Sequence, residues 1–342
     1  MNNVFIPLDQ LPVGRVVPVS ADYLEVLGTD RVDNVEKYLP PSYRAYRKNW
    51  SDRPLTMTVG DYPLHLDVEA AAVCNLRCTM CQIPFDTMPS GLISMDLFRK
   101  IMDEIRTHKA DLPSVKFNFR GEPTLHPQIA ELVRLAREAG IMEVQFNTNG
   151  TMLTEKLSRD LISAGLVRIK FSLDSMDPSL YDAVRKGARY EKTLERILEF
   201  IRVRNEMGSK LPSIVVQMVY MSMNQKELKD YIRFWENKVN RIGISRYRSG
   251  NNESGEVAQV ATSGQRKRFP CPQLWQRMVV LFDGTVLMCC GDHHSKNPIG
   301  NIRTRTIQEL WHSQELTAMR QLHSAHRYDE IDACRDCQIN CI

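Results

Sequence analysis

The fold of this 342-residue chain is indicated by residues 64–81, which read LHLDVEAAAVCNLRCTMC. The first ten of these residues are mostly apolar and predict a buried strand. The next eight place Cys74, Cys78 and Cys81 in a C-x3-C-x2-C pattern directly after it. In parallel α/β folds the carboxyl ends of the strands carry the ligand-binding loops, so we expect a functional site here.

Short apolar segments alternate with amphipathic ones over the next 170 or so residues, which favours repeated strand–helix units. Further strands are predicted at 115–119, 143–147, 168–173, 213–221 and 241–247. Helices are predicted at 94–106 (with Ser94 as N-cap), 127–139, 154–164, 178–185, 192–207 and 225–238. Six strands make a parallel sheet with right-handed crossovers but not a complete eight-stranded barrel. Periodicity alone leaves a partial barrel and an open doubly wound sheet as alternatives.

The cysteines are unevenly distributed along the chain. They are Cys74, Cys78, Cys81, Cys271, Cys289, Cys290, Cys334, Cys337 and Cys341. An odd number without a signal peptide argues against a disulfide framework, and the clustering favours metal sites.

The first cluster has the geometry for iron–sulfur chemistry. Three thiolates on one tight loop can hold one face of a [4Fe–4S] cluster and leave one iron open for a ligand. A zinc site or three incidental thiols are the alternatives. Zinc would need a fourth ligand nearby, and the nearest histidine, His65, lies on the preceding predicted strand.

Four more motifs follow, three at predicted strand ends and the last at the end of the helix predicted at 178–185. They are Gly121-Glu122-Pro123, Asn147-Thr148-Asn149-Gly150, Phe171-Ser172-Leu173-Asp174 and Tyr181-Asp182-Ala183-Val184-Arg185. With the cysteine motif, residues 64–247 resemble the radical S-adenosylmethionine (radical SAM) superfamily. The resemblance implies an α/β fold, a partial (β/α)6 TIM-like barrel. Arg120 departs from it, standing where a glycine is common, and Met80 stands where an aromatic residue is common.

The resemblance also implies the cofactors and the roles of the motif residues. Cys74, Cys78 and Cys81 would bind the [4Fe–4S] cluster, and Gly121, Glu122 and Pro123 would hold the amino group of S-adenosyl-L-methionine. Ser172, Asn149 and Arg185 would complete the cofactor pocket, Arg185 by pairing with the methionine carboxylate. An electron from a flavodoxin or ferredoxin reductant would then release a 5′-deoxyadenosyl radical, which abstracts hydrogen from the substrate.

The C-terminal cysteines resemble a second iron–sulfur unit. Cys271 is followed by twelve residues, Gly284, four residues and Cys289, and a hairpin is predicted from 279–282 and 286–288. This spacing resembles SPASM/Twitch auxiliary-cluster domains. We expect the shorter Twitch form, with one auxiliary [4Fe–4S] cluster on Cys271, Cys289, Cys334 and Cys337; a structural zinc is the alternative. Cys290 and Cys341 remain, each a small buried residue or a hydrogen-atom donor.

The predicted organisation is an N-terminal extension at 1–62, a radical SAM core at 63–250 and a SPASM/Twitch-like domain at 265–342, with a polar linker at 251–263. The net charge of +4, from 45 Lys+Arg and 41 Asp+Glu, is too small to favour nucleic acid as a partner. No apolar run of about 20 residues predicts a membrane span, and a cytoplasmic location is expected.

These observations lead to a hypothesis about function. The layout resembles the 2-deoxy-scyllo-inosamine dehydrogenase type of radical SAM enzyme, which implies oxidation of an alcohol to a ketone on a carbohydrate-like or aminocyclitol small molecule. An epimerase that uses Cys290 or Cys341, and a peptide-modifying enzyme, are the alternatives. The 62-residue extension is short for a leader-peptide-binding domain. Arg120, Arg246 and Arg248 are expected at strand ends, where they could hold an anionic group.

Overall fold

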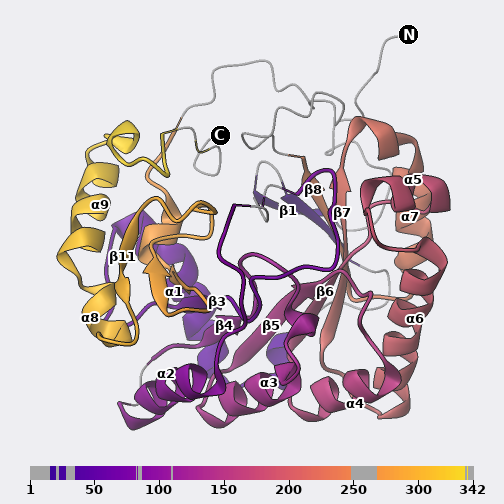
Figure 1. Cartoon of the computed structure of the whole chain (residues 1–342), viewed down its shortest axis with the longest axis horizontal. Coiled ribbons are helices and arrows are strands. Elements are labelled where there is room, and N and C mark those ends of the chain that lie inside the picture. The colour runs from indigo at the N-terminus through magenta and orange to yellow at the C-terminus, as the bar shows by residue number, and fades with distance from the viewer. Residues whose placement is uncertain are drawn as a thin grey trace.

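The structure is a computed structural model that describes residues 16–20, 23–27, 35–81, 83, 87–108, 111–247, 268–335 and 337. Its strands form a single sheet in the order β1-β2-β8-β7-β6-β5-β4-β3-β9-β10-β11. The sheet curls around a central space, with helices on its outer side (Figure 1). No helix in these described segments combines the length and the apolar character needed to cross a membrane.

The centre of the sheet contains the six parallel strands that the sequence predicts. They are β3 (His65–Val68), β4 (Ser114–Lys116), β5 (Glu143–Thr148), β6 (Arg168–Ser172), β7 (Ser213–Tyr220) and β8 (Arg241–Arg246). Their parallel pairing runs without interruption from β3 to β8. The expected partial (β/α)6 barrel is confirmed. The first strand is shorter than the ten residues predicted, because the chain leaves the ladder after Val68 and turns toward the cysteine loop.

Six helices cover the outside of these strands. They are α2 (Met95–Thr107), α3 (Ile129–Glu138), α4 (Glu155–Ser163), α5 (Pro178–Val184), α6 (Tyr190–Glu206) and α7 (Leu228–Trp235). Alternate strand residues such as Val115, Val144 and Ile169 are completely buried in the core that these helices share. The predicted N-cap of α2 is confirmed, since the backbone N–H of Leu97 donates to Ser94 Oγ at 3.2 Å.

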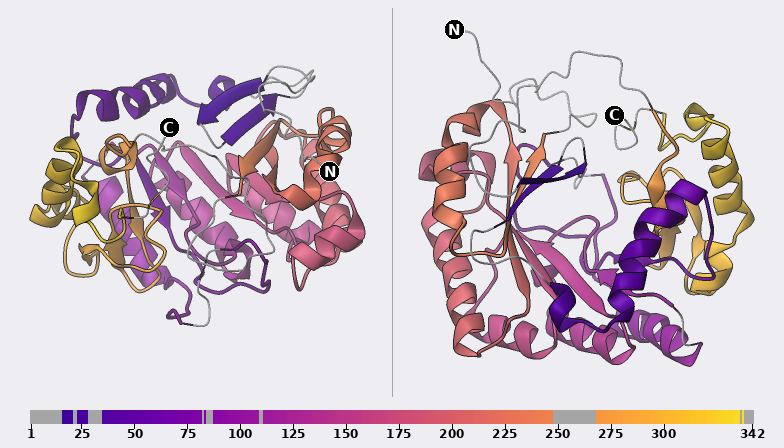
Figure 2. Two further views of the ribbon diagram at one scale, coloured as in Figure 1. Left: turned by 90° about the horizontal axis from the view of Figure 1, so that it is seen from above. Right: turned by 180° about the vertical axis from the view of Figure 1, so that it is seen from behind.

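The N-terminal extension is part of the same body, although its sequence shows no clear period. The hairpin of β1 (Val16–Ser20) and β2 (Tyr23–Leu27) pairs antiparallel with β8. In the rear view helix α1 (Ser42–Thr56) lies in front of the orange C-terminal segment (Figure 2). Tyr43 and Tyr46 donate to Glu143, at the first residue of β5, so α1 covers the amino ends of the strands. Its aromatic spacing at 43, 46 and 50 was the signal that could have predicted this helix.

The C-terminal segment extends the barrel sheet instead of standing apart from it. Strand β9 (Arg277–Val280) runs parallel to β3, and β10 (Thr285–Leu287) and β11 (Pro298–Asn301) follow antiparallel. The β9–β10 pair is the predicted hairpin. The short helix η5 (Pro272–Trp275), helices α8 (Ile307–Trp311) and α9 (Gln314–Ser324) and η6 (Tyr328–Glu330) complete the unit. The sequence analysis predicted neither α8 nor α9. The expected linker at 251–263 lies outside the described residues.

The inner face of the parallel strands is polar. Side chains alternate along a strand, so the residues between the buried core positions point inward. They include His65, Asp67, Lys116, Asn118, Gln145, Asn147, Lys170, Ser172, Gln217 and Ser245. Complete barrels fill this space mainly with branched apolar residues. The polar lining here is suited to a hydrogen-bonding ligand.

Candidate active site and cluster sites

The cysteine loop opens into a cavity at the carboxyl ends of the parallel strands. The cavity has a volume of about 250 Å³. Its lining includes eight of the residues that the motifs predicted: Cys74, Cys78, Cys81, Gly121, Glu122, Asn149, Ser172 and Arg185. Pro123 begins the adjoining turn η3 (Pro123–Leu125) and is not part of the lining. The motifs are scattered over more than 110 residues, and the barrel brings them to one place.

The lining also contains residues that the sequence analysis missed. Asn118 follows β4, and its side chain donates to the carbonyl of Asn147 at 3.0 Å. Thr148, at the end of β5, belongs to a motif that the sequence analysis quoted, but no role was predicted for it. Both positions are inward-facing or terminal strand residues, so the alternation pattern beside the motifs was the available signal.

Hydrogen bonds fix the cysteine loop to two other motifs. The backbone N–H groups of Arg77 and Thr79 donate to the carbonyls of Lys186 and Val184, both at 2.9 Å. The side-chain amide of Asn149 donates to the side-chain oxygen of Asn75 at 3.0 Å. The loop that carries the three thiols is therefore positioned by the Arg185 segment and by the end of β5.

Gly121 allows the second motif to approach the loop after β3. Its φ is +76°, and a Cβ at this position would lie 2.2 Å from the carbonyl oxygen of Ala71 and 2.5 Å from that of Val73. The next residue, Glu122, donates its backbone N–H to the same Val73 carbonyl at 2.8 Å. Only glycine combines this dihedral angle with this close backbone approach.

The carboxylate of Glu122 holds the end of β5. One of its oxygens accepts from Thr148 Oγ1 at 2.7 Å and from Thr124 N at 3.0 Å, and the other accepts from Asn149 N at 2.7 Å. Burial raises the pKa of Glu122, while these donors act in the opposite direction. Glu122 therefore positions the end of β5 in the cavity that the cysteine loop lines, which we call the cofactor cavity.

The three thiols of the loop fit the cofactor that the motif implies. Burial raises the pKa of Cys74 to about 11 and also raises those of Cys78 and Cys81. The thiols therefore hold their protons at neutral pH until iron displaces them. Thiolates are the ligands of iron–sulfur clusters, with one bound at each ligated iron. Within the described residues, no group of three His, Cys, Asp or Glu side chains is arranged to hold a single metal ion.

The C-terminal cysteines form the second group. Cys271, Cys289 and Cys334 are buried, and burial raises the pKa of Cys271 and of Cys334 to about 12. The neighbouring thiol of Cys337 contributes to both shifts, so three of the four predicted ligands lie close together. Cys289 interacts electrostatically with Cys271 and Cys334 as well. The four thiols fit an auxiliary cluster by the same donor chemistry.

A histidine joins this group that no sequence pattern indicated. His323 on α9 accepts a hydrogen bond from the backbone N–H of Cys271 at 3.1 Å through Nδ1. Its Nε2 lies 3.4 Å from the sulfur of Cys334. Burial lowers the pKa of His323 to about 4, so the ring is neutral, and Nε2–H can donate to the sulfur.

Cys290 turns toward the barrel. Its thiol donates to the side-chain oxygen of Gln273 at 3.0 Å and lies 3.9 Å from the Arg277 guanidinium. Arg277 in turn pairs with Asp67 on β3 at 3.1 Å. Cys290 thus connects the C-terminal unit to the polar interior, whereas Cys341 lies outside the described residues.

One of the three expected anion-binding arginines, Arg120, is not available as predicted. Arg120 does not face the mouth: its Nε and Nη2 donate to the two oxygens of Glu69 at 2.5 and 2.9 Å. The two side chains are 3% and 0% exposed. This bidentate pair explains why a cation stands where glycine is common, since it neutralises a buried acid directly after β3. The side chain of Arg246 and all of Arg248 lie outside the described residues.

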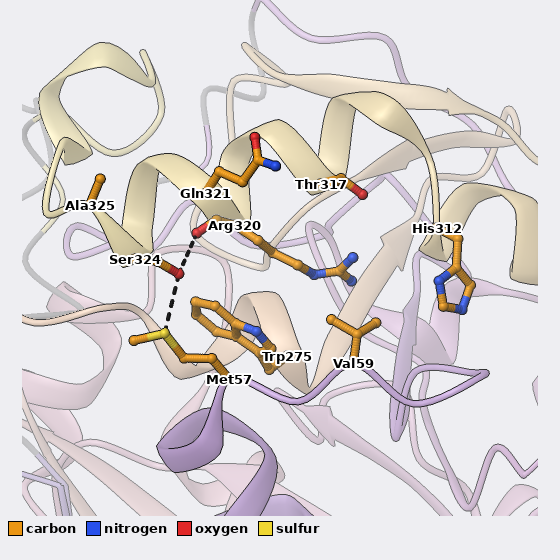
Figure 3. A pocket seen from close by; sticks show the side chains of 9 residues that line it. All are labelled: Met57, Val59, Trp275, His312, Thr317, Arg320, Gln321, Ser324 and Ala325. Atoms are coloured by element: carbon orange, nitrogen blue, oxygen red, sulfur yellow. Dashed lines mark hydrogen bonds between the residues drawn. The ribbon is translucent and has the colours of Figure 1, made fainter.

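A second cavity, of about 520 Å³, lies between the end of α1, η5 and α9 (Figure 3). Among its lining residues is Arg320, whose Nε and Nη1 donate to the backbone carbonyls of Leu274 and Trp311, both at 2.9 Å. These bonds tie α9 to η5 and α8. The lining contains no cysteine and none of the predicted site residues, so this cavity is separate from the candidate active site.

Comparisons with known families agree with this arrangement. Residues 68–234 match the profile of the radical SAM superfamily, and residues 271–338 match that of SPASM, an iron–sulfur cluster-binding domain. A curated relative is the tungsten-containing aldehyde ferredoxin oxidoreductase cofactor-modifying protein of Pyrococcus furiosus. It is 26% identical over 80% of this chain and 87% of its own length. A GTP 3′,8-cyclase of Peptoclostridium acidaminophilum is 29% identical over 60% of this chain and 63% of its own.

Solved structures share the fold. BtrN in complex with AdoMet and 2-DOIA superposes with a TM-score of 0.53 at 20% identity, over 80% of this chain and 92% of BtrN. Streptococcus suis SuiB bound to S-adenosylmethionine gives 0.63 at 15% identity, over 82% and 72%. The protein anSMEcpe with bound AdoMet gives 0.61 at 17% identity, over 81% and 87%.

Proposed function

Because this chain belongs to the radical SAM superfamily and carries a SPASM domain, we propose that it oxidises an alcohol of a sugar-like or aminocyclitol substrate to a ketone. Its cofactors are S-adenosyl-L-methionine, the [4Fe–4S] cluster that binds it, and auxiliary iron–sulfur clusters in the SPASM domain. When bound, these groups supply a 5′-deoxyadenosyl radical and an acceptor for an electron. The barrel residues bind and orient the substrate and exclude water.

The observation that carries this proposal is the continuity of the sheet between the two cluster sites. Strand β9 of the SPASM unit pairs with β3 over four residues, and the Arg277–Asp67 ion pair crosses the same junction. Oxidation of a carbinol removes one hydrogen atom, one proton and one electron. An electron acceptor must therefore lie close to the substrate. The unit that carries the SPASM cysteines meets this need, because its strand β9 pairs directly with β3 of the barrel.

The lining of the barrel supports a polar substrate. Asn118, Asn147 and Ser172 line the cofactor cavity, and Gln145 and Gln217 lie on the same inward face. Amides and hydroxyls both donate and accept hydrogen bonds, so they match the hydroxyl groups of a sugar or an aminocyclitol. The likeness to BtrN, solved with AdoMet and 2-DOIA, points to the same substrate class.

A second candidate, an epimerase, is favoured by the position of Cys290. Its thiol is half-buried and faces the junction of β9, β3 and β4, where Lys116 and Asp67 interact with it electrostatically. A thiol at this place could return a hydrogen atom to a substrate radical. In that reaction no electron leaves the substrate, and the product keeps its mass.

An anaerobic reaction in deuterium oxide separates the two candidates. The reconstituted protein is incubated with reductant, S-adenosyl-L-methionine and a panel of sugars, sugar phosphates, nucleotide sugars and aminocyclitols. We expect a product two hydrogens lighter, formed equally well by the Cys290→Ala and Cys290→Ser variants. A product of unchanged hydrogen content that carries one carbon-bound deuterium, lost together with turnover in both variants while 5′-deoxyadenosine still forms, would establish the epimerase instead.

A further inference from the structure

The polar interior contains a lysine whose charge the described residues do not neutralise. Lys116 lies on β4 between Val115 and Phe117, which are both completely buried in the helix-facing core. Alternation therefore directs the lysine side chain into the barrel. Two residues further along the same face, Asn118 lines the cofactor cavity. The Cα of Lys116 is therefore about 7 Å from the Cα of Asn118, toward the amino ends of the strands.

The acid nearest to Lys116 is already engaged. In the strand register Lys116 lies between Asp67 of β3 and Gln145 of β5. Asp67 pairs with Arg277 at 3.1 Å and lies 3.3 Å from His65 Nε2. Among the described residues, the side-chain ammonium of Lys116 forms no hydrogen bond and no ion pair within 4 Å; only its backbone is bonded, for example to the N–H of Asn118 at 2.9 Å. Burial lowers its pKa, and the charge of Asp67 only partly opposes this effect.

Two other acids beside these strands also have cationic partners, and Glu122, which has none among the described residues, is not among the charges that act on Lys116. Glu69 is bound in bidentate fashion by Arg120, and Glu143 pairs with Arg168 at 3.3 Å. The acids of β3 and β5 are therefore matched by arginines, and Lys116 adds a positive charge. A partly desolvated ammonium without a counterion destabilises a fold, so its presence next to a ligand cavity calls for an anion from the ligand.

We propose that Lys116 binds an anionic group of the substrate, a phosphate or a carboxylate, and that the substrate is an acidic polyol instead of a neutral one. The anionic group would lie at the depth of Lys116, and the polyol would extend past Asn118 toward the cofactor. This inference rests on the proposed carbohydrate function for the shape of the substrate. The charge selectivity itself is independent of the reaction, because it concerns binding alone.

Binding to the anaerobic holoprotein with S-adenosyl-L-methionine present tests the proposal by calorimetry. The probes are glucose 6-phosphate, UDP-glucose, glucuronate and glucose, so that phosphate, carboxylate and neutral sugars are compared. The variants are Lys116→Met, which keeps the length of the side chain without its charge, and Lys116→Arg. Lys229→Met removes the same charge from the exposed face of α7 and is the matched control.

We expect at least one anionic probe to bind the wild-type protein more tightly than glucose does. Lys116→Met should weaken that probe about 10- to 100-fold, the range for hydrogen bonds to charged groups. Lys116→Arg should stay within about 3-fold and Lys229→Met should show no change, and glucose binding should not depend on Lys116. Comparison of the two phosphate-containing probes with glucuronate identifies whether the protein selects a phosphate or a carboxylate.

Two results would overturn the proposal. One is that no anionic probe binds the wild-type protein better than glucose. The other is that Lys116→Met weakens glucose and the anionic probes equally, which would assign the lysine a structural role. Failure of the proposed dehydrogenation looks different, because it appears as the absence of a lighter product while charge-selective binding persists.

Discussion

The guanidinium of Arg185 donates to Asp174 at 2.6 Å and lies 3.8 Å from the sulfur of Cys78. The arginine expected to meet the cofactor carboxylate is therefore held in place by the chain itself. Asp174 is 1% exposed and also accepts from the backbone N–H of Val219 at 2.8 Å. This carboxylate links the end of β6, the cofactor cavity and β7.

Asp174→Asn should destabilise the fold because it leaves the Arg185 cation inside the protein without its partner. We expect the free energy of unfolding to fall by about 3 kcal/mol, measured by anaerobic denaturant titration. Asp230→Asn is the control, since the Arg233–Asp230 pair is 75% and 73% exposed and should contribute less than about 0.5 kcal/mol. Equal effects at the two sites would contradict the structural role of Asp174.

Gly121→Ala should damage the cofactor cavity through the backbone. The new methyl group would overlap the carbonyl of Ala71, so we expect a loss of about 3 kcal/mol in stability and loss of S-adenosyl-L-methionine cleavage. Gly140→Ala is a matched control: its φ is +95°, but nothing lies within 4 Å of a Cβ there. That variant should cost about 1 kcal/mol and keep cleavage. Thermal unfolding and the yield of 5′-deoxyadenosine distinguish the two.

The iron content should divide between the two groups of cysteines. Anaerobic reconstitution should give about eight iron atoms per chain, from two four-iron clusters. Replacing Cys74, Cys78 and Cys81 by Ala should halve the iron and abolish cleavage of S-adenosyl-L-methionine. Replacing Cys271, Cys289, Cys334 and Cys337 should also halve it but leave that cleavage intact. Four iron atoms with one zinc in the wild-type protein would show that the C-terminal site is not an iron–sulfur cluster.

His323→Gln should loosen the auxiliary site alone. The ring joins the backbone of Cys271 to the sulfur of Cys334, and outer-shell partners of this kind typically change metal affinity 10- to 100-fold. We expect faster loss of about half the iron to a chelator, with unchanged cleavage of S-adenosyl-L-methionine. His312→Gln, on the exposed start of the α8–α9 turn, is the control. Unchanged chelator resistance in the His323 variant would limit the histidine to a packing role.

Much of the core was predictable because its signals are local. The six parallel strands and their helices follow from the alternation of short apolar segments with amphipathic ones. Ser94 caps α2 as expected from the preference for serine at helix N-caps. Most of the motif residues reached one cavity because they lie at or just after the carboxyl end of a strand, and Arg185 reaches it from the end of α5. Among the elements that were missed, α1, α8 and α9 are stabilised by contacts with distant segments. Trp50 of α1, for example, lies 5.0 Å from the Arg277 guanidinium, 227 positions away in the sequence.

The sequence by itself determined the chemistry of this protein: which thiols occur together, which strand ends carry them, and therefore which cofactors the chain can use. Only the tertiary structure decided which charges remain available. Arg120 was expected to be open to a ligand and is neutralised by Glu69, 51 residues earlier, whereas Lys116 drew no attention in the sequence and has no such partner. Side-chain alternation predicts the face on which a residue lies. Compensation of a charge depends on which distant strand packs beside it, and this is fixed only when the sheet forms.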